Sequence, residues 1–148
     1  MTDRATSTTL AYVLTLGIAT ILVSGLIVAG STFVEDRREQ VIRQELQVIG
    51  EHVASNIDQV DRYVRAGDDV STARVEQDLP NSVTGATYDL RLVEGSDPTL
   101  FLNSTQPDVS VSVDITTVTD VADSNAGGGT VVVECTDGNC DEIEINNG

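Results

Sequence analysis

The sequence predicts an α+β protein in which a long N-terminal helix, first transmembrane and then amphipathic, packs on a small antiparallel β-sheet. Two observations support this fold class. An uncharged run separates Arg4 from Glu35, and further along the chain the spacing of apolar residues changes from that of a helix to that of a strand. A chain of 148 residues has room for one small domain besides such a helix.

The uncharged run from Thr6 to Val34 predicts a membrane-spanning helix. This run is longer than the helix of about 20 apolar residues that is needed to cross a bilayer core. The apolar region of a secretory signal peptide is shorter, about 7–15 residues, and usually precedes a small-residue cleavage site. The alternative is a buried helix of a soluble protein, but a domain of this size could hardly surround so long an uncharged helix. We therefore expect membrane lipid as a partner of residues 6–34.

Residues 35–66 continue as an amphipathic extension of the same helix. One apolar stripe recurs at steps of three and four, at Ile42, Leu46, Ile49, Val53, Ile57, Val60 and Val64. Charged residues, Asp61 among them, are expected on the other faces, and Gly50 is expected only to weaken the helix. We predict one helix from about Thr8 to Arg65, ended by Gly67.

Residues 67–148 are predicted to form an acidic β domain. Apolar and polar residues alternate around Leu90 and Val111, which predicts half-buried strands. Further strands are expected at 99–103, 130–134 and 142–145, giving about five strands that the amphipathic helix covers. Residues 70–79 are left open between a short helix and a loop, and the segment 123–129, DSNAGGG, has the composition of a flexible loop.

The charge of the chain excludes one class of partner. The formal net charge is −16, and Lys is absent, so that all eight basic residues are Arg. Such a surface repels nucleic acid and anionic lipid, and we expect neither as a partner. Dispersed carboxylates without Lys resemble the composition of proteins from extreme halophiles, where molar salt shortens the Debye length to about 3 Å.

Two cysteines, Cys135 and Cys140, are predicted to form a disulfide. If Asp137-Gly138 is a two-residue hairpin turn, the cysteines lie opposite each other as a non-hydrogen-bonded pair, whose close α-carbons suit a cross-strand bond. Such a bond persists outside the cell. The same register places Glu134 opposite Asp141. The rival interpretation is a metal or redox site, but no second ligand cluster accompanies the cysteines.

No grouping for catalysis is evident in the sequence. It contains one His, no phosphate-binding Gly loop and no Ser/His/Asp arrangement, so we expect no catalytic, cofactor-binding or metal-binding residues and no enzyme activity. Asn103-Ser104-Thr105 matches the acceptor pattern for N-glycosylation and lies beside a predicted turn. Asn103 is therefore a candidate glycosylation site.

Small residues recur four apart within the apolar run, and this spacing lets helices approach closely in lipid. They are Ala11, Thr15, Ala19, Gly25 and Ala29. Gly and Ala are also common in membrane helices generally, so a role in helix packing and a merely compositional origin both stay open.

The N-terminal segment resembles that of archaeal type IV pilin-like proteins, more narrowly the small haloarchaeal ones. The residues that carry the resemblance are Arg4, Ala5, Ser7, Thr8, Thr9, Leu10, Tyr12, Val13, Leu14, Thr15 and Leu16. The resemblance implies a leader, residues 1–5, that a prepilin peptidase removes between Ala5 and Thr6. It also implies a cytoplasmic N-terminus, an extracellular C-terminal domain, and other pilin-like subunits as partners in a surface filament.

Leu10 stands at the fifth mature position, where many pilins carry Glu, which favours a minor or accessory subunit over a principal one. The alternative function is a membrane-anchored extracellular binding domain that does not polymerise. In both, we expect a single-pass protein of the cell membrane.

Overall fold

The computed structural model describes residues 3–67, 70–135 and 138–148, and for residues 3–8 it describes the backbone alone. The chain forms two compact units, residues 1–38 and 39–148. One helix, α1 (Asp3–Ala66), supplies the first unit and continues into the second. The predicted fold class is confirmed, since a long N-terminal apolar helix is combined with small β-sheets that pack on its amphipathic part.

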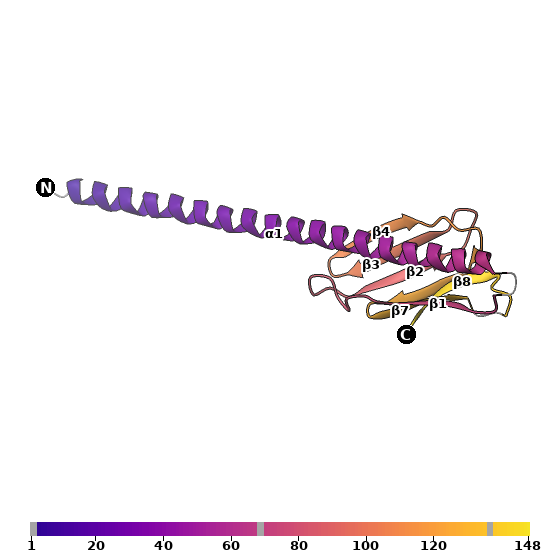
Figure 1. The fold of residues 1–148 in the computed structure, drawn as a ribbon. Coiled ribbons are helices and arrows are strands. Elements are labelled where there is room, and N and C mark those ends of the chain that lie inside the picture. Colours follow the sequence, from indigo (N-terminus) through magenta and orange to yellow (C-terminus); the bar gives the residue numbers. More distant parts are fainter. Residues whose placement is uncertain (1–2, 68–69, 136–137) are drawn as a thin grey trace. The chain divides into compact units, whose positions relative to one another are not determined.

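All strands belong to the second unit (Figure 1). They are β1 (Ala73–Asp78), β2 (Tyr88–Val93), β3 (Thr99–Thr105), β4 (Asp108–Asp114), β5 (Asp120–Val121), β6 (Ser124–Gly127), β7 (Thr130–Cys135) and β8 (Glu142–Asn147). They form two four-stranded sheets, with the orders β1-β7-β8-β5 and β4-β3-β2-β6. The five strands expected from alternation are present, but the expectation of about five strands was too low.

Residues 70–79, left open between a short helix and a loop, contain strand β1. Every residue of β1 pairs with β7 in antiparallel register, from Ala73 opposite Cys135 to Asp78 opposite Thr130. β7 lies between β1 and β8, and the backbone N–H and C=O groups on each edge of such a strand need partners. The local sequence around β1 does not reveal that need.

The flexible loop expected at residues 123–129 was also wrong, because residues 124–127 form strand β6, paired with β2. Ser124 explains why. Its side chain is buried, and its hydroxyl donates to the carbonyl oxygen of Ala122 at 3.1 Å and accepts from the backbone N–H of Ile145 at 3.0 Å. The bond from Ile145 fastens β6 to β8, and the bond to Ala122 fixes the chain just before β6, although the segment is rich in glycine.

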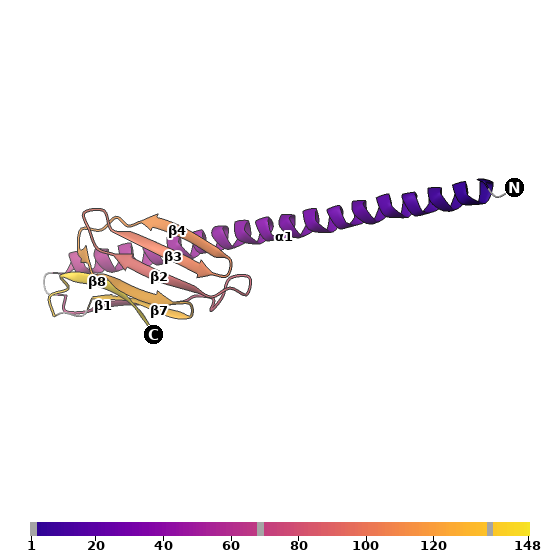
Figure 2. The same ribbon diagram turned by 180° about the vertical axis from the view of Figure 1, so that it is seen from behind.

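The core of the second unit lies between α1 and the sheets, and Figures 1 and 2 show this part of α1 over one face of the strands. The predicted apolar stripe is confirmed: Ile42, Leu46, Val53, Ile57 and Val60 have no exposed surface, and Ile49 has 6%. Opposite the stripe lie the inward residues of the strands, Leu90, Leu92, Leu100, Leu102, Val131, Val133, Ile143 and Ile145.

Gly50 has a packing role beyond the weakening predicted from helix propensity. A β-carbon at this position would lie 2.7 Å from Cγ2 of Val113 and 2.8 Å from Cδ1 of Leu102. Both distances are shorter than carbon–carbon contact, which is about 3.5–4.0 Å. Glycine therefore lets α1 approach β3 and β4 closely.

The strand register predicted from a two-residue hairpin between the cysteines was wrong. Strand β8 begins at Glu142, and Glu134 pairs with Glu144 instead of Asp141. On its other side Glu134 pairs with Arg74 of β1, whose guanidinium Nη1 lies 3.8 Å from its carboxylate. Residues 136 and 137, the first part of the predicted turn, lie outside the described residues.

Candidate functional site

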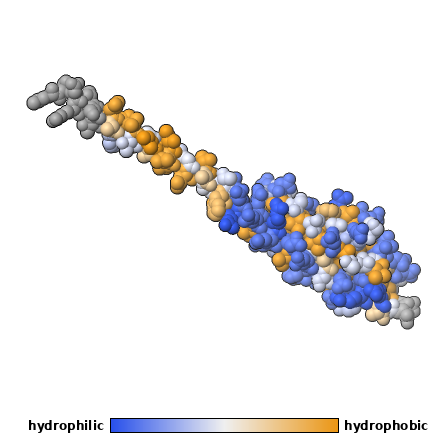
Figure 3. Space-filling model, turned by 90° about the horizontal axis from the view of Figure 1, so that it is seen from above, coloured by the Kyte–Doolittle hydropathy of each residue, from blue (hydrophilic) through white to orange (hydrophobic). Residues whose placement is uncertain are grey.

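Every residue of the apolar part of α1 from Leu10 to Val34 is exposed. It is long and apolar enough to cross a membrane, and no residue of its apolar 18-residue stretch is buried. Figure 3 shows the contrast between this apolar segment, in orange, and the largely hydrophilic surface of the second unit. A helix that is apolar all round is stable in water only if something else covers it.

The Ser and Thr hydroxyl groups of residues 15–32 donate hydrogen bonds to the helix itself. Thr15 donates to the carbonyl oxygen of Ala11 and Thr20 to that of Leu16, each at 2.8 Å, and Ser24 donates to that of Thr20 at 2.9 Å. Ser31 and Thr32 both donate to the carbonyl oxygen of Val28. Because each of these donors is already paired within the helix, the segment can enter an apolar environment without leaving them unsatisfied.

The small residues predicted to pack helices lie in this exposed segment. Ala11, Thr15, Ala19, Gly25 and Ala29 are all exposed, and the space around Gly25 is open. The segment ends at a cation–π contact, with the Arg37 guanidinium 5.2 Å from the centre of the Phe33 ring. The proposed cleavage point, Ala5 and Thr6, lies in α1, but its side chains are outside the described residues.

In the second unit, a carboxylate on α1 holds a loop. Asp61 was expected on a polar face, but it is 2% exposed. Its Oδ1 accepts from the backbone N–H of Val118 at 3.2 Å and from that of Thr119 at 2.9 Å, and Arg65 Nη1 lies 3.4 Å from its Oδ2. The expectation failed because helix periodicity cannot show that a later loop folds over this position.

The pKa of Asp61 is set by opposing effects. Burial of the carboxylate raises it, but hydrogen bonds from Thr119, Val118 and Arg65 outweigh that effect and hold the pKa below its ordinary value of 3.8. Asp61 is thus ionised at neutral pH and fastens residues 118–119 to α1. The role of this group is structural, because its acceptor atoms are already occupied by the protein.

The two cysteines are joined in a disulfide, with their α-carbons 5.0 Å apart. Cys135 is the last residue of β7, whereas Cys140 lies in the connection before β8 with a φ of 51°. The bond therefore ties a strand end to a loop and is not the cross-strand pair of the predicted register. Disulfides persist in oxidising compartments, which fits an extracellular location of this unit.

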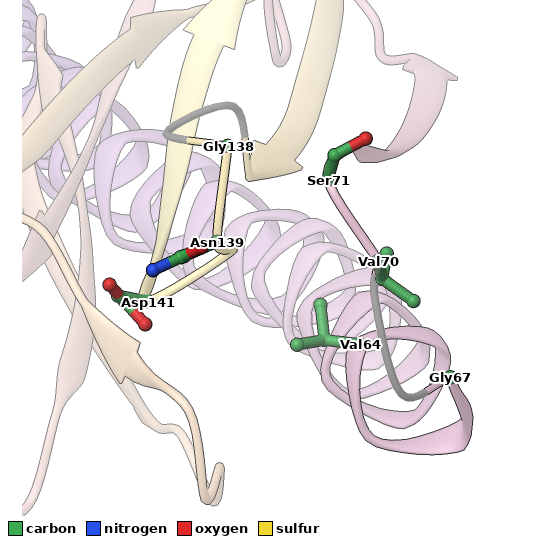
Figure 4. Close-up of a pocket in the computed structure, with 7 residues that line it drawn as sticks. All are labelled: Val64, Gly67, Val70, Ser71, Gly138, Asn139 and Asp141. Carbon is green, nitrogen blue, oxygen red and sulfur yellow. The ribbon is translucent and has the colours of Figure 1, made fainter.

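A pocket of about 410 Å³ lies beside this connection (Figure 4). Val64, Gly67, Val70 and Ser71 line it on the side of α1, and Gly138, Asn139 and Asp141 line it on the other. Asp141 is its only ionisable lining residue among those described, and Ser71 contributes the only side-chain hydroxyl among them.

A second pocket, a groove of about 710 Å³, runs between α1 and residues 77–82. Its apolar residues are Val41, Val48, Ile49, Leu79 and Pro80, and its polar ones are Gln44, Glu45, His52, Gln77, Asp78 and Ser82. Val41 and Val48 are 40% and 51% exposed, so this part of α1 also presents apolar surface. Within residues 3–67, 70–135 and 138–148, no group of three His, Cys, Asp or Glu side chains is arranged to hold a metal ion.

Asn103 lies within β3, on the face of its sheet that points away from the core, two residues further from the turn than the sequence indicated. It pairs with Asp89 of β2 and with Ser110 of β4. Its Oδ1 accepts a hydrogen bond from the Ser110 hydroxyl at 2.8 Å. The candidate glycosylation residue is therefore partly exposed on a regular strand.

Comparison with known protein families finds one match, over residues 1–146, to a family of unknown function, DUF7266. No curated protein and no solved structure matches the chain.

Proposed function

The chain belongs to the DUF7266 family, whose function is unknown. We propose that it is a structural subunit of a surface filament of the archaeal type IV pilus kind, in a minor or accessory position. It is held in the cell membrane by residues 6–34, with the leader in the cytoplasm and the acidic second unit outside. A prepilin peptidase removes residues 1–5, and other pilin-like subunits are its partners.

The observation that carries this proposal is that the two parts of one helix, α1, distribute their apolar residues differently. Within α1, residues 10–34 are exposed and apolar all round, whereas residues 42–60 bury one stripe in their own domain. An apolar helix that serves two environments in turn, lipid before assembly and neighbouring helices afterwards, needs apolar residues on every side and small residues for close approach. Gly25, surrounded by open space, and Ala29 meet that need.

The acidic surface and the disulfide support the location. The net charge of −16 suits a domain exposed to concentrated salt outside the cell. The disulfide between Cys135 and Cys140 suits an oxidising environment. Of the two features, the disulfide supports the orientation with the second unit outside.

The first test is the mature N-terminus. Protein isolated from the membranes and from the sheared surface fraction of its own cells should begin at Thr6, as read by mass spectrometry of the N-terminal peptide. It should also sediment with filaments after shearing. A chain that keeps its first residues and is extracted only as a detergent-soluble monomer would contradict assembly and would favour a membrane-anchored binding domain.

A pair of variants sharpens the test. Gly25→Leu fills the open position on α1, so we expect it to abolish sedimentation with filaments while membrane association is kept, because Leu is more apolar than Gly. Ile21→Leu, a swap of similar volume on the same helix, is the matched control and should assemble normally. Equal assembly of both variants would contradict packing through Gly25.

A further inference from the structure

The outward face of the sheet β4-β3-β2-β6 carries the only Asn-x-Ser/Thr tripeptide of the chain, at residues 103–105. Alternation along β3 places Asn103 and Thr105 on this face. Asn103 is half-buried and Thr105 is exposed, while Ser104 between them is 1% exposed. The two side chains that define the acceptor pattern are therefore presented together on the outside. We infer that Asn103 carries an N-linked oligosaccharide.

The environment of Asn103 suits attachment through its amide nitrogen. Oδ1 is occupied by the Ser110 hydroxyl at 2.8 Å, which fixes the orientation of the amide group. The residues beside it on the two neighbouring strands, Asp89 and Ser110, have short side chains. A sugar on Nδ2 thus extends from the sheet over small polar neighbours, and no core residue must move to admit it.

Phe101 provides a second, independent observation. It lies two residues before Asn103 on the same face of β3 and is 38% exposed. Among the described strand residues, it is the only large apolar side chain that is exposed to this degree. Positions i and i+2 of a strand are about 7 Å apart, so the first sugar on Asn103 can reach this ring. The C–H face of a sugar packs on an aromatic ring, and this contact would cover the exposed surface of Phe101.

The chemistry of attachment balances without a redox step. The donor is an oligosaccharide linked through phosphate to a polyprenyl lipid, and a membrane transferase catalyses the step. Nδ2 of Asn103 bonds to the anomeric carbon as the bond from that carbon to the phosphate oxygen breaks. The lipid phosphate leaves with the bonding electrons, and the amide nitrogen gives up one proton. An extracellular location of this domain, with which its disulfide agrees, would bring it to the side of the membrane where such transfer occurs.

The test is the intact mass of the full chain purified from its own cells. We expect the mass to exceed that of the polypeptide by an oligosaccharide, and the excess to map to the peptide that contains Asn103. Thr105→Ser keeps the acceptor pattern and should keep the excess. Thr105→Ala and Asn103→Gln should both lose it. An unmodified wild-type mass, or an unchanged excess in Thr105→Ala, would overturn the inference.

Folding is controlled independently, because Thr105→Ala retains Asn103 and its bond to Ser110. Each variant should form the disulfide and give the circular dichroism spectrum of the wild type. The role of Phe101 has its own readout. Loss of the sugar in Thr105→Ala should lower the Tm by about 3–5 °C, and in a Phe101→Ser background this difference should disappear. A difference that persists unchanged would overturn the contact with the ring. None of these measurements depends on filament assembly, so they can fail or succeed apart from the proposed function.

Discussion

The two units of the chain use one helix in opposite ways. In residues 10–34, the apolar side chains surround α1 and are all exposed. In residues 42–60, the stripe from Ile42 to Val60 is almost completely buried, and Val48 on another face is 51% exposed. The stripe of the second unit is therefore covered by its own strands, whereas no part of the chain that the structure describes covers the apolar side chains of residues 10–34. Substitutions of the same type should have different consequences in the two units, and the following predictions test that difference.

The largest difference is expected between two leucines of α1. Leu46 has no exposed surface, and Leu22 is 66% exposed. Leu46→Ala should lower the free energy of unfolding of the second unit by about 2–5 kcal/mol, because it leaves a cavity in the core. Leu22→Ala is the matched control and should change it by less than about 0.5 kcal/mol. Both are measured by denaturant unfolding of the full chain in detergent, and equal losses would contradict the division into units.

The next effect concerns the close approach of α1 to the sheet. Gly50→Leu places a large side chain against Leu102 and Val113, and overpacking of this kind costs about 1–3 kcal/mol. Gly30→Leu on the apolar segment, where nothing lies within 4 Å, is the control. Thermal unfolding followed by near-ultraviolet circular dichroism should show a lower Tm for Gly50→Leu alone. An unchanged Tm would show that the helix does not need glycine here.

A smaller effect, confined to acid, is expected for Asp61. Its pKa is lowered on folding, so ionised Asp61 stabilises the protein above its unfolded pKa, and this contribution is lost as the pH falls through the lower, folded value. The loss therefore begins below about pH 4. Asp61→Asn keeps an oxygen acceptor for Val118 and Thr119 but does not titrate, so the variant should lose less stability between pH 5 and 2 than the wild type, by about 1 kcal/mol.

Hydrogen exchange at the amides of residues 118 and 119 gives a local measure of the same group. In the wild type, these amides should become less protected as the pH falls, after correction for the intrinsic exchange rate. In Asp61→Asn, protection should depend less on pH. Identical pH profiles in the two proteins would show that Asp61 does not fasten the loop.

The smallest effect is expected from like charges that face each other across strands. Glu134 lies opposite Glu144, and such a pair is destabilising by about 0.2–1 kcal/mol in dilute buffer. Molar salt screens the repulsion. Glu144→Gln should therefore stabilise the protein at about 0.1 M salt and have no effect at about 3 M. Glu94→Gln, outside the strands, is the control, and an equal response of both would assign the salt dependence to overall charge alone.

Patterns within one segment predicted much of this fold, and the errors occurred where distant segments meet. The stripe from Ile42 to Val60 and the alternation around Leu90 required only neighbours in sequence. Strand β1 and the burial of Asp61 depend on partners 52 or more residues away, namely β7 and the loop at 118–119. Glycine-rich β6 was mistaken for a flexible loop because composition does not report that Ser124 bonds to β8.

For the candidate sites, chemistry was easier to predict than geometry. The pairing of Cys135 with Cys140 was predicted correctly, but the hairpin register from which it was argued was wrong, because β8 starts only at Glu142. Asn103 was identified from its tripeptide, and a strand was expected at 99–103. The extension of β3 to Thr105 and the exposure of the nearby ring of Phe101 needed the structure. The groove beside Val41 and Val48 could not be predicted from the sequence, in which these residues are only two valines seven positions apart.

The position of β8 also sets an order of events during synthesis. This strand lies between β7 and β5, and among the described residues it is the last strand to be synthesised. The sheet therefore cannot close until residue 147 has left the ribosome, and until then the apolar stripe of α1 has no complete cover. A newly made chain is thus most open to aggregation and proteolysis while its first helix is already complete.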